Sequence, residues 1–293
     1  MKLPNVMCIG ASKSGTTSLY NILRQHSNVY VPTFKEPHFF DIPESYNKGL
    51  DWYKRTYFNN TKSKKCIIDF TPTYLFEKLA PERIYNDLGS KVKFIVLLRN
   101  PVTRSFSQYL HSKRDMHETL SFKDALSEEN QRMMSDNYLS KLRYSYVNQG
   151  LYYKMLSNYF NFFSKENFLI IHFEEEFVAK RKETIDKIFS FLQIGKEDIN
   201  INLQSNPASY ARFKWLKRVI RKEGSWRSII KKLIPSVKIR QIIKNNLQRI
   251  NIIEYNTIKL SEFDKISTFE KYFKNDVALL EDLINRKMNW END

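Results

Sequence analysis

Short apolar runs alternate with amphipathic segments through the first two thirds of this chain of 293 residues. The runs are rich in β-branched and aromatic side chains, as strands are, and they lie at Val6–Gly10, Cys66–Phe70, Val92–Leu98 and Phe168–Phe173. The segments that follow them are typical of helices, at 16–25, 100–111, 150–163 and 184–192. Strands buried on both faces and separated by helices form parallel sheets. We therefore predict an α/β fold, with a mostly parallel sheet flanked by helices on both faces.

Positive charge is concentrated in one segment of the chain. The formal net charge is +16, and the segment 205–250 contains thirteen Lys or Arg residues and one acidic residue, Glu223. Beyond Asn206 the pattern becomes helical, without clear strands. A basic surface of this kind attracts phosphate, sulfate, nucleic acid or an anionic membrane. We expect one domain over 1–293, in which residues 1–200 form the α/β core and residues 201–293 form a basic, helical C-terminal extension.

The loop after the first predicted strand has the composition of an anion site. It reads Gly-Ala-Ser-Lys-Ser-Gly from Gly10 to Gly15, and a helix with hydroxyl residues in its first turn follows. Backbone N–H groups at such a helix start point towards a bound phosphate, and Lys13 adds a full charge. The glycine spacing matches a Walker A loop, but Thr16 stands where that motif has its lysine. A P-loop-like fold is therefore expected, and a nucleotide-dependent kinase is an alternative function.

A second basic motif follows the strongest predicted strand. Arg99 stands at the carboxyl end of the run 92–98, at the edge where open α/β sheets bind ligands, and Ser107 lies further on in the next helix. Two separated anion sites suit a ligand with phosphate groups about one nucleoside apart. Arg104 fits the same motif, although on a helix it can also simply face solvent.

A third cluster lies in the loop Lys35–Asp41, between these two motifs. Glu36, His38 and Asp41 are set there among aromatic residues and a proline. A carboxylate in apolar surroundings can have its pKa raised towards neutrality by desolvation, which suits a general base. Either Glu36 or His38 can serve as the base, and composition does not choose between them.

Together the motifs resemble those of sulfotransferases that use 3′-phosphoadenosine 5′-phosphosulfate (PAPS). The loop 35–41 resembles the K-E-x-H-F-F-D segment of heparan sulfate 3-O-sulfotransferases and their bacterial relatives, and the resemblance covers roughly residues 4–173. It implies transfer of a sulfuryl group to a hydroxyl, with a carbohydrate as the expected acceptor. It further implies 3′-phosphate contacts from Arg99 and Ser107, and 5′-phosphosulfate contacts from Lys13, Ser14, Gly15, Thr16, Thr17 and Ser18, among which Lys13 stabilises the leaving phosphate.

The same resemblance implies roles on the acceptor side of the site. Glu36 is implied as the catalytic base, with His38 and Asp41 orienting it or the acceptor. We expect Asp41, and Arg212 in the basic segment, to contact the acceptor. Members of the family often have an active-site lysine at the position of Phe70, so this chain lacks one expected cation.

The remaining expectations concern partners and compartment. The expected donor and product are PAPS and 3′-phosphoadenosine 5′-phosphate (PAP), and an anionic glycan is a candidate acceptor. Cys8 and Cys66 fall in apolar runs without ligand spacing, so we expect reduced core residues and no metal. No apolar run is long enough for a signal peptide or a membrane span, which predicts a cytoplasmic location and leaves peripheral membrane contact open. A nucleic-acid-binding module is a further alternative, on charge alone, and we expect no nucleic acid partner.

Overall fold

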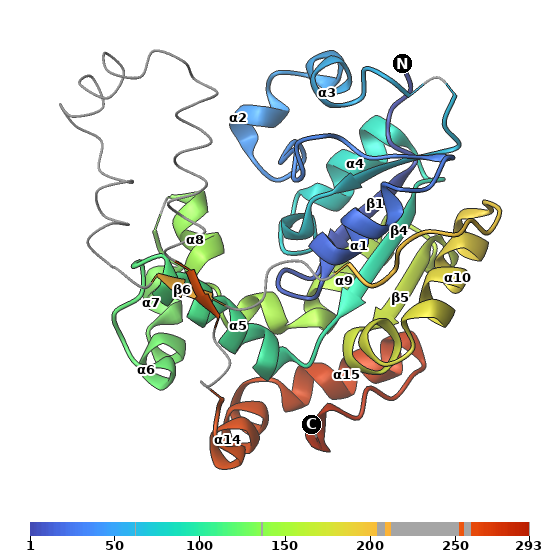
Figure 1. Cartoon of the computed structure of the whole chain (residues 1–293). Coiled ribbons are helices and arrows are strands. Elements are labelled where there is room, and N and C mark those ends of the chain that lie inside the picture. Colours follow the sequence, from blue (N-terminus) through green and yellow to red (C-terminus); the bar gives the residue numbers. More distant parts are fainter. Residues whose placement is uncertain (62, 136, 204–208, 212–251, 255–258, 293) are drawn as a thin grey trace, which may run out of the picture. The chain divides into compact units, whose positions relative to one another are not determined.

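The computed structural model describes residues 1–293 except 62, 136, 204–208, 212–251, 255–258 and 293 (Figure 1). The chain divides into two compact units. The basic segment predicted at 205–250 lies outside the described residues, except for 209–211. The single domain over 1–293 stays a prediction. The first unit comprises Met1–Tyr109, Leu120–Ser205 and Leu260–Asp293, and the second comprises Leu110–Thr119 and Asn206–Lys259.

A five-stranded parallel sheet forms the centre of the first unit, in the order β2-β3-β1-β4-β5. The chain runs from β1 to β2 and β3 on one side and to β4 and β5 on the other. The carboxyl ends of β1 and β4 are therefore a topological switch point, where open α/β sheets bind ligands. The predicted parallel sheet is confirmed, and its strands are β1 (Val6–Gly10), β2 (Val29–Tyr30), β3 (Cys66–Phe70), β4 (Lys93–Leu98) and β5 (Phe168–His172).

Helices connect the strands. Proline occupies the first turn of α4 and opens α5, where its missing N–H costs no hydrogen bond. The helices predicted at 16–25, 100–111, 150–163 and 184–192 are confirmed as α1, α5, α9 and α10, with ends that differ by a few residues. The α-helices are α1 (Thr16–Leu23), α2 (Pro43–Tyr46), α3 (Leu50–Tyr57), α4 (Ala80–Leu88), α5 (Pro101–Arg114), α6 (Phe122–Ser127), α7 (Glu129–Arg132), α8 (Tyr138–Tyr144), α9 (Tyr152–Phe160), α10 (Arg181–Leu192), α14 (Glu262–Tyr272) and α15 (Lys274–Ile284).

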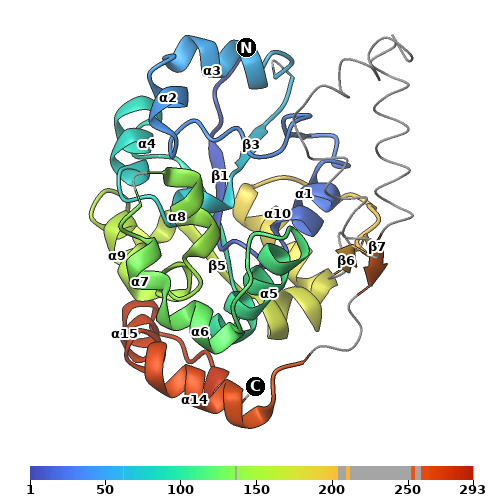
Figure 2. The same cartoon turned by 90° about the vertical axis from the view of Figure 1, so that its left-hand side faces the viewer.

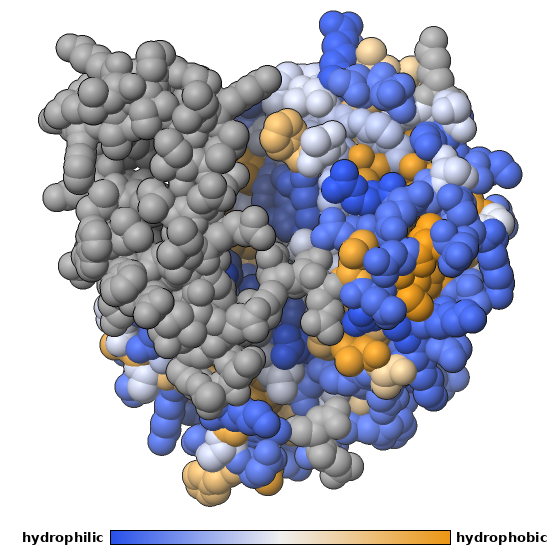
Figure 3. Space-filling view, viewed as in Figure 1, coloured by the Kyte–Doolittle hydropathy of each residue, from blue (hydrophilic) through white to orange (hydrophobic). Residues whose placement is uncertain are grey.

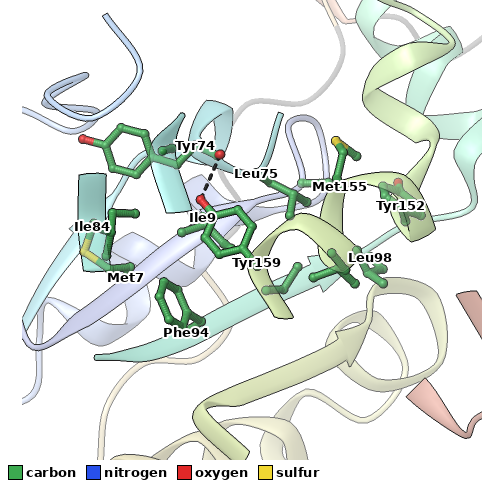
Figure 4. Packing of buried hydrophobic residues seen from close by; sticks show 14 of the residues in the cluster. Met7, Ile9, Tyr74, Leu75, Ile84, Phe94, Leu98, Tyr152, Met155 and Tyr159 are labelled. Atoms are coloured by element: carbon green, nitrogen blue, oxygen red, sulfur yellow. Dashed lines mark hydrogen bonds between the residues drawn. The ribbon is translucent and has the colours of Figure 1, made fainter. Parts of the chain in front are cut away.

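Alternate side chains of each strand enter two cores, one on either face of the sheet. Met7 and Ile9 of β1 pack in the core formed with α4, α9 and α15 (Figure 4), while Val6 and Cys8 pack in the core formed with α1 and α10. Figure 2 shows α4 and α9 on one side of the strands and α1 and α10 on the other. Coverage on both faces explains why the strands read as continuous apolar runs. Cys8 and Cys66 are buried and free, as predicted.

The C-terminal residues 260–293 belong to the core of the first unit. Ser261 caps α14 by accepting a hydrogen bond from the backbone of its first turn. α15 packs against α9, and Phe273, just before α15, and Leu280 within it are buried in the same core as Met7. The Trp290 side chain is 2% exposed and its ring lies 5.6 Å from that of Tyr152. This part of the predicted C-terminal extension therefore completes the α/β core.

In the described part of the second unit, two short strands correct one expectation. β6 (Ser209–Ala211) and β7 (Ile252–Glu254) pair in antiparallel orientation. The expectation of a helical pattern without clear strands beyond Asn206 is therefore wrong at these residues. Strands of three residues are too short to give a readable alternation of apolar and polar side chains, which is why the sequence did not indicate them.

The described surface on the face seen in Figure 3 is mostly hydrophilic, with groups of hydrophobic residues among hydrophilic ones. Single exposed apolar side chains, such as Phe34 and Phe263, are ordinary on protein surfaces. Over the residues that the structure describes, no helix is both long enough and apolar enough to cross a membrane.

Replacing Trp290 with alanine tests the place of the C-terminal residues in the core. We expect Trp290→Ala to lower the free energy of unfolding by about 3–5 kcal/mol, because it removes a large buried ring. Phe263→Ala on α14 is the control, since that side chain is 79% exposed, and it should change stability by no more than about 0.5 kcal/mol. Urea denaturation measures both, and equal stability of the two variants would contradict the assignment.

Candidate active site

The predicted anion loop lies at the carboxyl end of the central strand β1. The Ala11 amide donates to the Leu97 carbonyl of β4 at 2.8 Å, so the loop is held between the two strands of the switch point. Lys13 and Gly15 both have positive φ angles, 69° and 80°, and α1 begins at Thr16 directly afterwards. The first N–H groups of a helix have no partner within the helix. The loop therefore presents backbone donors at one end of the sheet, and Lys13 lies within it.

Gly15 is required by its conformation and by its surroundings. Its φ of +80° suits glycine, and a Cβ atom there would lie 2.7 Å from the ring of Phe173. Phe173 begins a π-helical turn, Phe173–Val178, directly after β5. The loop thus packs against a third segment at the carboxyl edge of the sheet.

A buried hydroxyl in the loop lacks an internal partner. The Ser14 side chain is fully buried, and its Oγ atom has no hydrogen-bond partner within the described part of the chain. Thr16 is also buried, while Thr17 and Ser18 are half-buried at the start of α1. A buried hydroxyl without a partner is uncommon in folded proteins. An anionic ligand with several acceptor oxygens would satisfy it, so this loop fits the 5′-phosphosulfate predicted for it.

Arg99 connects the second predicted motif to the loop. Its Nη1 atom donates to the Lys13 carbonyl at 3.0 Å, and its Nε atom donates to Thr103 Oγ1 at 3.0 Å. The guanidinium also lies 5.2 Å from the centre of the Phe173 ring. Burial lowers the pKa of Arg99, and the nearby carboxylate of Glu174 opposes this effect. The structure therefore brings Lys13 and Arg99, which are 86 residues apart in sequence, to the same place.

The rest of the second motif lies on α5. Ser107 is half-buried, one helical turn beyond Thr103, which places both on the same side of the helix. The alternative that Arg104 simply faces solvent is wrong. Its side chain is fully buried and donates to Gln108 Oε1 at 2.7 Å and to the Tyr146 carbonyl. Arg104 therefore supports the fold around α5.

The third predicted cluster forms a line of charges. His38 Nδ1 lies 2.8 Å from Asp41 Oδ2, and His38 Nε2 lies 3.7 Å from Glu36 Oε2. The Asp41 side chain is buried and also accepts a hydrogen bond from Thr73. Burial opposes protonation of His38, but the hydrogen bonds and charges of Asp41 and Glu36 outweigh it and raise the pKa of His38 to about 10. His38 is therefore a cation between two carboxylates.

Glu36 differs from the expectation in its acidity. Burial tends to raise the pKa of Glu36, but hydrogen bonds from His38 and Lys35 and their charges lower it to about 2. The expectation that apolar surroundings raise this pKa towards neutrality is therefore wrong for the structure. The side chain is 37% exposed and contacts the Lys35 ammonium. Glu36 is the more exposed carboxylate of the cluster, whereas Asp41 is fully enclosed.

Phe70, at the position where the family often has lysine, lies in the core. Its side chain is 1% exposed and packs edge-on against Tyr20, with ring centroids 5.5 Å apart. It lies in the core on the α1 side of the sheet. This position therefore supplies packing. Arg212, predicted to contact the acceptor, lies outside the described residues.

Sequence reasoning missed several residues that the structure adds to the site. Thr73 follows β3 and bonds Asp41, and Glu174 follows β5 and accepts the Asn100 amide at 3.1 Å. Both stand just beyond the carboxyl end of a parallel strand, so the rule that located Arg99 could have located them. Within the described ranges, no group of three or more His, Cys, Asp or Glu side chains could hold a metal ion.

The parallel sheet and the loop at its switch point define an α/β protein of the P-loop-like class. The chain belongs to the sulfotransferase family, since the model of the sulfotransferase domain matches residues 3–233. This match decides among the classes that the sequence motifs left open.

Individual relatives agree with this assignment. Human heparan sulfate glucosamine 3-O-sulfotransferase 5 is 27% identical over 209 residues, which cover 70% of this chain and 58% of the relative. Human heparan sulfate glucosamine 3-O-sulfotransferase 3B1 is 31% identical over 208 residues, which cover 65% of this chain and 50% of the relative. The chain thus spans little more than half the length of these relatives. The crystal structure of a sulfotransferase from Alicyclobacillus acidocaldarius is similar over 100% of both chains, with a TM-score of 0.71 and 25% identity.

One glycine substitution in two backgrounds tests the close contact at the anion loop. Gly15 has φ 80° and ψ 9°, so an added Cβ should cost about 1–2 kcal/mol of folding stability from the left-handed backbone alone. Gly15→Ala should cost more in the wild type, because the Phe173 ring lies 2.7 Å from the added Cβ and must also move. The same glycine substitution in a Phe173→Ala background, which lacks this ring, should cost less. Chemical denaturation measures both losses, and an equal loss in the two backgrounds would show that the contact is unimportant.

The charge on His38 predicts a pH-dependent stability. Its pKa is raised from 6.5 to about 10, so the stabilisation it gives is fully present below pH 6.5 and is lost as the pH rises towards 10. The difference in unfolding free energy between the wild type and His38→Asn should therefore shrink over this range. Denaturation at several pH values measures it. A difference that does not depend on pH would contradict the ion-paired histidine.

Proposed function

We propose that this protein transfers a sulfuryl group from PAPS to a hydroxyl of a carbohydrate acceptor. The observation that carries the proposal is the hydrogen bond from Arg99 to the Lys13 carbonyl, because it joins, at the switch point, the two motifs for which we propose anion binding. Membership of the sulfotransferase family supports the reaction type. The names of the similar human enzymes support a glycan as the acceptor class.

The donor would be held at both of its anionic ends. Lys13 and the residues Ser14–Ser18 would bind the 5′-phosphosulfate through the loop backbone, the start of α1 and the unpartnered Ser14 hydroxyl. Arg99 and Ser107 would bind the 3′-phosphate, with Thr103 holding the Arg99 side chain. When bound, the donor supplies the sulfuryl group and PAP is the leaving group. The Lys13 ammonium would stabilise the negative charge that develops on the departing 5′-phosphate.

Glu36 would accept the proton of the acceptor hydroxyl. It is ionised at neutral pH, and of the two carboxylates in the cluster it is the exposed one. A carboxylate with a pKa of about 2 is a weak base. We therefore assign proton transfer to a late point in the reaction. By then the bond between the sulfur and the acceptor oxygen is forming, and the hydroxyl is far more acidic than a free alcohol. His38 would orient Glu36, and Asp41 would hold His38.

Fewer residues support the assignment of the side of the site that binds the acceptor. The Asp41 side chain is 0% exposed and bonds His38 and Thr73, which favours support of the base over direct contact with the acceptor. Arg212 and the surrounding basic segment remain proposed acceptor contacts, and an anionic glycan would suit their charge.

Thermal stability with different nucleotides tests the donor. PAP and PAPS should raise the melting temperature clearly more than ATP does, because ATP lacks a 3′-phosphate. Arg99→Gln should weaken PAP binding by about 1.5–3 kcal/mol, the range for a hydrogen bond to a charged group. Arg55→Gln is the matched control, since Arg55 is an exposed residue of α3, and it should bind PAP as the wild type does. Equal stabilisation by ATP and PAP would overturn the donor assignment.

A further inference from the structure

One buried carboxylate has no part in the proposed reaction. Asp69 stands near the end of β3, and its side chain is fully buried. Its Oδ1 atom accepts from Thr71 Oγ1 at 2.6 Å, and its Oδ2 atom accepts from the hydroxyls of Tyr53 at 2.6 Å and Tyr74 at 3.1 Å. Burying a carboxylate is costly unless it is well hydrogen-bonded. Three hydroxyl donors offset this cost at Asp69, and they point to a specific structural role for its carboxylate.

The Tyr74 hydroxyl links this carboxylate to the predicted base loop. It donates to Asp69 and accepts from the Phe39 amide at 2.9 Å. A phenol has a single proton. Burial raises the pKa of Asp69 to about 6, against the effect of its hydroxyl hydrogen bonds, so at neutral pH the carboxylate is mostly ionised and can only accept. Asp69 therefore makes Tyr74 the donor, which leaves the phenol oxygen free to accept the amide proton of Phe39. The backbone of Tyr74 is fixed in turn, because its carbonyl accepts from the Tyr159 hydroxyl at 2.9 Å (Figure 4).

The base loop needs such outside support. Glu36 and His38 have φ angles of 64° and 51°, a left-handed conformation that residues with a Cβ atom seldom adopt. Such conformations persist when surrounding contacts determine them. Two contacts from the segment after β3 hold the residues that follow His38: the Tyr74 hydroxyl accepts from the Phe39 amide, and Thr73 donates to Asp41.

We propose that Asp69 is a positioning residue for the base loop 36–41, and that it acts through the Tyr74 hydroxyl on the Phe39 amide. The role of the loop in proton transfer rests on the proposed function, but its geometry does not. Because Tyr74 donates its proton to Asp69, its oxygen accepts from the Phe39 amide. This hydrogen bond fixes the loop, which then holds Glu36 and His38 in their left-handed conformations. Tyr53 binds the same Asp69 oxygen without a hydrogen bond to the loop.

This difference between the two tyrosines provides a matched experiment. Tyr74→Phe and Tyr53→Phe each keep the ring and remove one hydroxyl donor from Asp69. Only Tyr74→Phe also removes the acceptor of the Phe39 amide. We expect Tyr74→Phe to lower kcat about 10- to 100-fold, as misplaced catalytic groups do, and to leave the Kd for PAP unchanged. Tyr53→Phe should lose thermal stability but keep kcat and the Kd for PAP.

An NMR titration of His38 tests the positioning without reference to catalysis. Its ring signal, assigned by comparison with His38→Asn, should titrate near pH 10 in the wild type. In Tyr74→Phe this pKa should fall by about one unit or more, because the ion pairs with Asp41 and Glu36 loosen. It should not move in Tyr53→Phe. Asp69→Asn should resemble Tyr74→Phe, and it serves as the second variant if Tyr74→Phe does not fold.

The outcomes separate this inference from the proposed function. A wild type that transfers no sulfuryl group would overturn the proposed function, whereas the His38 titration would still test the positioning. An unchanged His38 titration in folded Tyr74→Phe and in Asp69→Asn would overturn the inference. An equal effect of Tyr53→Phe on His38 would also overturn it, because the hydrogen bond to Phe39 would then have no separate role.

Discussion

Arg99 donates a hydrogen bond across the edge of the sheet to the Lys13 carbonyl, and the arrangement of the site depends on this contact. It joins the loop after β1 to the residue that follows β4, and the Phe173 ring packs against both Arg99 and the Gly15 backbone. Because β1 and β4 are neighbours in a parallel sheet, their carboxyl ends meet. The topology therefore brings the Arg99 guanidinium to the backbone of the loop that carries Lys13.

Much of the fold could be predicted because the sheet is covered on both faces. Runs such as Lys93–Leu98 are apolar at nearly every position and stand out in the sequence. The two-residue strand β2 and the three-residue strands β6 and β7 carry no such signal. The sequence indicates only a helical extension over residues 260–293, because an amphipathic helix does not reveal which core it covers. Trp290, which packs against Tyr152, could be placed only once α9 and α15 were seen together.

The site was predictable where its residues form local motifs. Lys13, Arg99 and Glu36 each lie in a short pattern, and the structure places Lys13 and Arg99 in direct contact. Some partners that control their chemistry come from distant segments, such as Glu174 beside Arg99, and even neighbours in the same motif act through their geometry. Lys35 and His38 lower the pKa of Glu36, whereas the sequence suggested a rise from burial alone. The competition between desolvation and neighbouring charges depends on geometry, which no local motif encodes.

Direct observation of sulfuryl transfer tests the central claim. The wild-type protein would be incubated with sulfur-labelled PAPS and a panel of glycans, lipids and small alcohols, with mass detection of the products, beside Glu36→Gln. The variant keeps the size of the side chain and removes the carboxylate. The account predicts a sulfated glycan with the wild type and turnover about 10²–10⁴-fold lower with the variant. Absence of labelled product from every acceptor, or equal turnover of the two proteins, would contradict it.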